Sequence, residues 1–408
     1  MKARIALGGL LSFATVSLLL VASSTLQLLK DGGARPEGYE YIAEYSGLLN
    51  YVVPAWLALA LVVLAVLLLR KPRALLRTRG HLPVLFGVLA VISSLWAPDP
   101  GSSFRSATLL LSGVTLLLFY SNQVDSRTQY RTLLYFLSAL SVASAVASVA
   151  VPAYGISVGT HEGAWQGIFS HKNELGAASV LTLAVSLGYA NIKRNWKTTA
   201  ISLLSILLIL CSRSTTAMLV ASLLLAAHVL LRFNAVTRML RHSTLLVVVI
   251  LLVSLPASVV VSNSQSFSIG SKDSSFSGRT YIWGYFLTRI AERPLLGHGY
   301  NAYRSIVSEG IEERSIRKEV GFMVSSSHNG YLDVAFSNGL AGLVLFVAIV
   351  FSMIRTSRKG EHLIPTLFVA VAYLLTNQLE SKGASFTLNF FAIVLLYAAC
   401  RAWSAHKA

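Results

Sequence analysis

Long apolar stretches alternate with short polar connections along the whole chain. A hydrocarbon core about 30 Å thick is crossed by a helix of roughly 20 apolar residues. By this measure the pattern predicts about twelve membrane-spanning helices, several of them short. The predicted spans lie near residues 5–29, 49–69, 82–96, 105–120, 133–152, 174–192, 198–211, 214–231, 243–261, 331–354, 363–378 and 385–400.

The composition supports this interpretation. Of the 408 residues, 54% are hydrophobic and only 12% are charged, whereas soluble proteins carry about 25% charged residues. The first apolar stretch is longer than a signal-peptide core, and no small-residue cleavage site follows it, so we expect a retained span. The two cysteines, Cys211 and Cys400, suggest neither a metal cluster nor a disulfide framework. The sequence therefore predicts an all-α integral membrane protein, with residues 1–408 forming one polytopic domain.

The basic residues are unevenly divided between the two sides of the membrane. If the N-terminus is cytoplasmic, most Lys and Arg residues of the short connections fall on the inner side, as the positive-inside rule requires. This orientation places both termini in the cytoplasm and the long segment 262–330, between the ninth and tenth spans, outside. Contacts with the lipid bilayer account for most of the net charge of +17. No nucleic-acid partner is therefore expected.

The long outward segment has two parts. It opens with a serine-rich run over 262–277 and changes character at Gly278. Apolar and aromatic side chains from Arg279 onward predict a helix that ends at Pro294 and lies at the membrane interface. The alternative is a helix that packs only on the bundle. The spans show no internal repeat, which gives no support to an inverted-repeat transporter.

Two polar groups beside predicted spans could bind an anion. His171, Lys172 and Asn173 stand at the start of an apolar helix, where a cation and the backbone N–H groups together favour an anion. Arg213 lies in a polar break between two apolar runs. An arginine at membrane depth costs about 2.5–3.5 kcal/mol and usually has a partner, a wet cavity or a function. The alternatives are a simple interfacial cap for Lys172 and an outward-reaching side chain for Arg213.

The outward segment holds two further candidates. Arg279 opens the predicted interfacial helix, where its guanidinium and the helix N–H groups could face a phosphate; the alternative is a solvated charge. His328 stands just before a span, with Asn329 and Asp333 near enough in sequence to orient its ring. Imidazole titrates near neutral pH and is the usual general base for a hydroxyl. A lone histidine of this kind is, however, more often structural.

Five motifs in this order resemble the O-antigen ligase and polysaccharide polymerase superfamily. They cover residues from about 160 to 345, and the first four spans add only hydropathy. Each motif is weak alone, but the ordered set is fairly specific. The motifs are GIFSHKNELG at 167–176, SRST at 212–215, SGR at 277–279, PLLGHG at 294–299 and HNGYL at 328–332.

The resemblance implies a membrane glycosyltransferase of the GT-C-like kind, acting outside the bacterial cytoplasmic (inner) membrane on a glycan carried by undecaprenyl diphosphate. In that family a histidine matching His328 activates the acceptor hydroxyl, and arginines matching Arg213 and Arg279 bind the diphosphate. We expect Lys172 and His171 to assist the arginines, with Asn173, Asn329 and Asp333 in supporting roles. A sugar diphosphate already carries a good leaving group, so cations and one base suffice and neither cofactor nor metal is expected.

Several functions remain open at this point. We expect an inverting in-line displacement, and the compact His-Lys-Asn signature favours polymerisation of O-antigen or exopolysaccharide repeats. A ligase that transfers the glycan to a lipid A core, or to a protein, shares the same donor chemistry. A transporter or flippase for the lipid-linked glycan is less favoured, because the unusual charges gather on one side only. The outward carboxylates that could assist the base are left unranked: Glu162, Glu174, Asp333 and Glu380.

Overall fold

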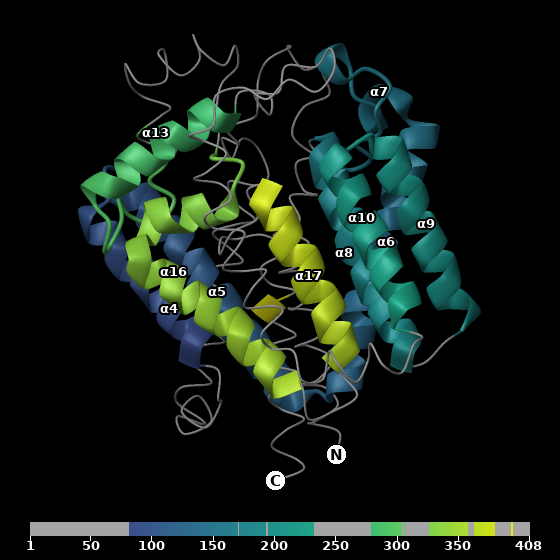
Figure 1. Ribbon diagram of the computed structural model, residues 1–408, viewed down its shortest axis with the longest axis horizontal. Helices are drawn as coiled ribbons and strands as arrows, with labels where there is room; N and C mark the ends of the chain where they lie inside the picture. Colours follow the sequence, from purple (N-terminus) through teal and green to yellow (C-terminus); the bar gives the residue numbers. More distant parts are fainter. Residues whose placement is uncertain are drawn as a thin grey trace.

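The computed structural model describes residues 81–169, 171–192, 195–231, 279–303, 306, 326–357, 363–379 and 393–394. This part of the chain is nearly all helical (Figure 1). It contains no strand, and one isolated β-bridge joins Ile156 to Trp165. The helices are α4 (His81–Ser93), α5 (Pro100–Gln123), α6 (Ser126–Ala150), α7 (Pro152–Gly155), α8 (Lys172–Ile192), α9 (Trp196–Ser212), α10 (Thr215–Leu230), α13 (Arg279–Glu292), α16 (Gly330–Ser357) and α17 (Leu363–Leu379), with short 3-10 helices at Ser94–Trp96 and Gly159–His161.

Each predicted span that falls in the described part coincides with a helix. The helices are α4 with its 3-10 extension, α5, α6, α8, α9, α10, α16 and α17. Among the described residues, three stretches are long and apolar enough to cross a membrane, namely Pro100–Ser121, Ser126–Ala150 and Gly330–Ser357, and shorter apolar helices accompany them. The chain is thus a multi-pass, all-α membrane protein. The predicted spans at 5–29, 49–69, 243–261 and, apart from 393–394, 385–400 lie outside the described residues, so the count of about twelve stays a prediction.

Polar caps set the helix starts. Asp99 accepts a hydrogen bond from the Ser102 N–H (3.0 Å), with Pro100 at the first helical position of α5. Asp125 caps α6 in the same way. Asn195 and Thr198 form a reciprocal capping box at the start of α9. These side chains satisfy N–H groups that have no partner within the helix, so each apolar run begins at a defined residue.

The helices form two groups joined by α16 and α17. In one group α8 packs against α6, α9, α10 and α17; in the other α4 packs against α5 and α16. Gly188 on α8 lies so close to Pro365 on α17 that an added Cβ would be 2.8 Å from the proline Cα. The start of α17 therefore lies beside the end of α8, and the two helices run antiparallel. Figure 1 shows α17 between the group of α8 and α10 and the group of α16 and α5.

Helix α16 is broken at Gly339, and the loop after α13 fills the break. Gly339 has φ 61° and ψ −160°, a conformation essentially restricted to glycine. The break separates backbone groups that would otherwise pair within the helix. Loop 294–299 pairs with them: the N–H of His298 donates to Phe336 O (2.8 Å), and the N–H of Leu340 donates to Pro294 O (2.8 Å). Helix α13 and this loop are therefore tied to α16 by main-chain hydrogen bonds.

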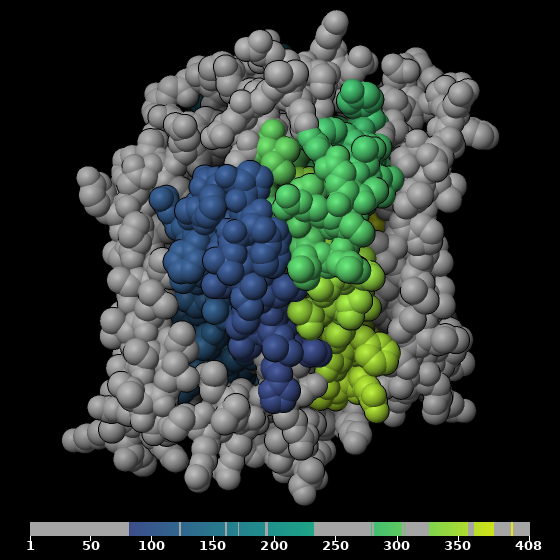
Figure 2. Space-filling model, turned by 90° about the vertical axis from the view of Figure 1, so that its left-hand side faces the viewer, coloured from purple at the N-terminus to yellow at the C-terminus, as the bar shows by residue number. Residues whose placement is uncertain are grey.

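A second, smaller core fixes α13 on the first part of α16. This core consists of Ile282, Trp283, Phe286, Ala302, Tyr303, Leu332 and Phe336. Figure 2 shows α13 and its loop, in green, above the yellow-green α16 and beside the blue segment of α4 and α5. The helix predicted from Arg279 to Pro294 is confirmed, and it packs on the bundle. The expected place of α13 at the membrane interface stays a prediction.

Candidate functional site

Arg213 occupies a tight turn between α9 and α10. It has φ 49°, the left-handed conformation, and caps α9, while Ser214 caps α10 through the N–H of Ala217. The turn is as short as the sequence indicated. The Arg213 side chain is exposed, and its Nη1 donates to the backbone oxygen of Glu162 (3.3 Å). The guanidinium therefore lies over the connection between α6 and α8.

That connection is held firmly against the ends of α6 and α9. The N–H of Trp165 donates to Cys211 O (2.9 Å) at the end of α9. The side chain of Gln166 donates to Tyr154 O (2.8 Å). Gly167, the first residue of the GIFSHKNELG motif, has φ 60°, and an added Cβ would overlap Ser144 on α6. Glycine is therefore needed here both for its conformation and for the close approach.

The connection leads into the His-Lys-Asn triplet at the start of α8. The helix begins at Lys172, as predicted. Lys172 Nζ lies 3.5 Å from the backbone oxygen of Arg213. His171 Nδ1 accepts a hydrogen bond from the N–H of Asn173 (3.2 Å), and its ring meets that of His161 edge-on at 5.4 Å. Arg213, Lys172, His171 and Asn173 thus form one group, called here the first cluster.

His328 lies in a second cluster, at the start of α16. It has φ 53°, a conformation that asparagine and histidine tolerate better than most residues. The preceding Ser327 is fully buried, and its hydroxyl bonds Asp333 Oδ1 (2.6 Å) while accepting from the N–H of Asn329 (3.0 Å). The Asn329 side chain caps α16 by accepting from the N–H of Tyr331 (3.0 Å). Hydrogen bonds on both sides therefore fix the backbone at His328.

The supporting residues act on this turn through contacts that the sequence did not indicate. We expected Asp333 to orient the imidazole, and the structure shows Asp333 Oδ1 accepting from both the N–H (3.1 Å) and the hydroxyl of Ser327. Trp283 on α13 donates its indole N–H to the backbone oxygen of Ser327 (2.9 Å). Ser327 and Trp283 were not predicted as site residues. The only sequence signals were a serine next to the histidine and a tryptophan one helical turn after Arg279.

Arg279 is the first residue of α13, as predicted, and it is half-buried. The Trp283 bond, one turn further along α13, ties this helix to the turn that carries His328. The candidate diphosphate ligand Arg279 and the candidate base His328 therefore lie on elements that this buried hydrogen bond joins, in addition to the shared core and the main-chain bonds of loop 294–299.

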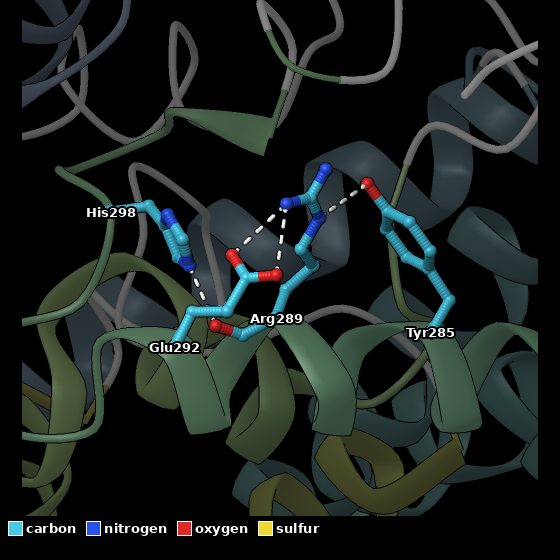
Figure 3. A network of polar contacts seen from close by, with 4 residues as sticks. All are labelled: Tyr285, Arg289, Glu292 and His298. Carbon is cyan, nitrogen blue, oxygen red and sulfur yellow. Dashed lines mark hydrogen bonds and ion pairs between the residues drawn. The ribbon is translucent and has the colours of Figure 1, made fainter. Parts of the chain in front are cut away.

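The far end of α13 is fixed by a polar network (Figure 3). The ring of His298 stacks on Phe336 at 4.7 Å, and its Nε2 lies 2.7 Å from the backbone oxygen of Arg289. A carbonyl can only accept, so this nitrogen carries a proton. Hydrogen bonding to Tyr285 and Glu292 raises the pKa of Arg289, although burial opposes this shift. The PLLGHG motif, which contains His298, therefore positions α13 and α16.

Helix α17 connects the two clusters. Tyr331 donates its hydroxyl to Leu374 O (3.2 Å) near the end of α17, and α17 runs antiparallel to α8, which starts at Lys172. Both clusters therefore lie at the same end of the bundle, called here the site end, which is the upper end in Figure 1. Asn377, in the last turn of α17, is fully buried, and within the described part of the chain both of its side-chain polar atoms lack a partner. The sequence indicated no role for this residue.

The described residues contain no group of three His, Cys, Asp or Glu side chains placed to hold a metal ion. The first cluster contains the cations Arg213 and Lys172, and the second contains a histidine and a carboxylate. This is a set of groups for binding an anion and accepting a proton.

Comparison with known proteins shows a family resemblance over part of the chain. Residues 200–347 match the family model described as O-antigen ligase. This segment runs from α9 to the second part of α16 and contains Arg213, Arg279 and His328. The predicted resemblance to the O-antigen ligase and polysaccharide polymerase superfamily is confirmed.

Two relatives agree with this result. The chain is 25% identical over 286 residues to the exopolysaccharide production protein ExoQ of Rhizobium meliloti, covering 65% of this chain and 62% of that protein. It is 33% identical over 99 residues to the O-antigen ligase of Pseudomonas aeruginosa, covering 24% of this chain and 22% of that protein. In both comparisons the match spans less than two thirds of the relative.

Proposed function

We propose that this protein is a membrane glycosyltransferase that polymerises surface polysaccharide repeats, using a glycan linked to undecaprenyl diphosphate as the donor. The reaction takes place on the outer face of the cytoplasmic membrane, and both termini face the cytoplasm. In this proposal Arg213, Arg279 and His328 act together at the site end of the bundle. The observation that carries the proposal is the link through α17, which joins the His328 turn to the helix that starts at Lys172.

The reaction is a single displacement at the anomeric carbon. The acceptor hydroxyl oxygen bonds to this carbon as the bond to the diphosphate oxygen breaks, which inverts the anomeric configuration. His328 takes the hydroxyl proton, and undecaprenyl diphosphate leaves with the bonding electron pair. Arg213 and Arg279 stabilise the negative charge that develops on the diphosphate, assisted by Lys172 and His171.

The acceptor distinguishes the two main candidates. The match to an exopolysaccharide production protein over 65% of the chain favours polymerisation, in which the acceptor is another repeat of the same glycan. A second candidate is transfer to a lipid A core, favoured by the shorter match to an O-antigen ligase.

The test uses the purified full-length protein in lipid nanodiscs with a defined undecaprenyl-diphosphate-linked oligosaccharide. Polymerisation predicts longer lipid-linked glycans without any added acceptor, which gel electrophoresis and mass spectrometry would detect. Product formed only after a lipid A core is added would instead indicate a ligase. If neither condition gives a covalent product, the enzyme proposal is wrong and transport becomes the better hypothesis.

Replacing Arg213 by lysine should lower kcat/KM in this assay by roughly ten-fold or more, because a charged hydrogen bond of about 1.5–3 kcal/mol is lost with the second arm of the guanidinium. Arg105→Lys is the matched control, since Arg105 is an exposed arginine near the start of α5, outside both clusters. Equal activity of the two variants would contradict the assignment of Arg213 to the diphosphate.

A further inference from the structure

A small cavity lies between α6, α8 and α9, at the end of the bundle away from the two clusters. It encloses about 100 Å³, and its lining includes Arg131, Tyr135, Tyr189, Asn195, Lys197 and Ile201. We propose that this basic cavity binds the phosphate headgroup of an anionic phospholipid. The site is separate from the glycan chemistry proposed above and does not depend on it.

Among the described residues, the lining offers hydrogen-bond donors and no carboxylate. Arg131 and Lys197 supply two positive charges, and Tyr135 and Tyr189 supply two hydroxyl groups. The Asn195 side chain accepts from the N–H of Thr198 (3.0 Å), so it serves the helix cap. Two cations and two phenols without a neighbouring carboxylate form a donor set suited to a phosphate.

Neither cation is neutralised within the described part of the chain. Arg131 Nη2 has a long contact with Thr128 Oγ1 (3.5 Å), and Lys197 Nζ lies 5.9 Å from the ring centre of Trp196. The acidic residue at the start of α6 is Asp125, whose two carboxylate oxygens accept from the N–H (2.9 Å) and hydroxyl (2.6 Å) of Thr128. Both charges are exposed and remain available to an anion.

An apolar stripe leads away from the cavity along α6. Tyr135, Val142, Val146 and Val149 are each more than half exposed. Their spacings of seven, four and three residues place them on one face of the helix. In a membrane-spanning helix such an exposed apolar face contacts acyl chains. The cavity and the stripe together match a charged headgroup joined to a hydrocarbon tail, which a free phosphate ion lacks.

A tryptophan beside the cavity supports a position at the headgroup region of the membrane. Trp196, the first residue of α9, is 76% exposed, and tryptophan is enriched where helices meet the headgroup region. In the predicted orientation this end faces the cytoplasm, where the anionic leaflet attracts basic residues. The cavity differs from a general basic surface because its two cations come from different helices, α6 and α9.

The fluorescence of Trp196 also provides a measurement of lipid binding at the cavity. Full-length protein in phosphatidylcholine nanodiscs would be titrated with brominated phosphatidylglycerol, and separately with brominated phosphatidylcholine, which quench tryptophan fluorescence on contact. Subtracting the signal of Trp196→Phe isolates this residue. We expect phosphatidylglycerol to be preferred, and Arg131→Gln or Lys197→Gln to reduce the preference roughly five-fold each, corresponding to about 1 kcal/mol per cation.

The matched control is Arg355→Gln. Arg355 is an exposed arginine in the last turn of α16, at the same end of the bundle but outside the cavity, and its loss should leave the preference unchanged. Equal quenching by both lipids, or equal effects of all three substitutions, would overturn the proposal. Displacement of phosphatidylglycerol by inorganic phosphate would also overturn it, because the cavity would then be a site for the free ion.

Discussion

Replacing His328 by asparagine is expected to slow glycan transfer by about 10²–10⁴-fold, the contribution typical of a general base. Asparagine is the informative substitution because His328 has φ 53°. Alanine at this conformation would strain the turn, whereas asparagine tolerates it and cannot accept the proton. The measurement is kcat for elongation of the lipid-linked glycan by the purified protein.

The control for this experiment is His81→Asn. His81 is an exposed histidine at the start of α4, at the opposite end of the bundle, so the same chemical change there should leave the rate unaltered. The melting temperature of both variants shows whether the fold is kept. A folded His328→Asn protein with undiminished transfer would remove the histidine from the mechanism.

The helices could be predicted from the sequence because their signals are local. Apolar runs of sufficient length define α5, α6 and α16, and polar caps such as Asp125 and Asn195 mark where helices begin. Helix α13 followed from its aromatic face and from Pro294. The break in α16 could not be predicted in this way, because a glycine inside an apolar run looks the same whether the helix continues or stops.

The candidate site was predictable in its residue types and only partly in its contacts. A lysine at a helix start and an arginine in a tight turn indicated an anion site, and the structure places Lys172 beside Arg213. The expected role of Asp333 in orienting His328 stays a prediction, and the structure adds a hydrogen bond from Ser327 to this carboxylate that the sequence did not indicate. Trp283 reaches Ser327 across 44 residues, and no local pattern encodes such a contact.

The PLLGHG motif shows how a motif can be identified without its role being known. The motif was recognisable in the sequence, but its partner is α16. An added Cβ at Gly297 would lie 2.6 Å from Gly339 N and Phe336 O. The motif therefore indicates a close crossing of two backbone segments, and only the structure shows which two. Its consequence for the site is indirect, because the crossing fixes the part of α16 that follows His328.

This crossing leads to the largest expected effect on stability. Gly339→Ala should destabilise the protein by about 3 kcal/mol or more, because the backbone conformation there excludes a side chain and the added Cβ would overlap the Leu295 carbonyl. Relieving the overlap requires the loop to move away from α16. The hydrogen bonds from His298 and Leu340 across the break would then lengthen or be lost.

The comparison that isolates this effect is Gly284→Ala. Gly284 lies inside α13, and an added Cβ there would meet no atom within 4 Å, so alanine should raise helix stability by about 0.5–1 kcal/mol. Thermal unfolding of the two variants in the same detergent, followed by tryptophan fluorescence, should give melting temperatures that shift in opposite directions. If the Gly339→Ala variant has the same melting temperature as the unaltered protein, the loop does not pack into the break as described. If Gly339→Ala has a much lower melting temperature and also loses glycan transfer, the crossing also maintains the turn at His328.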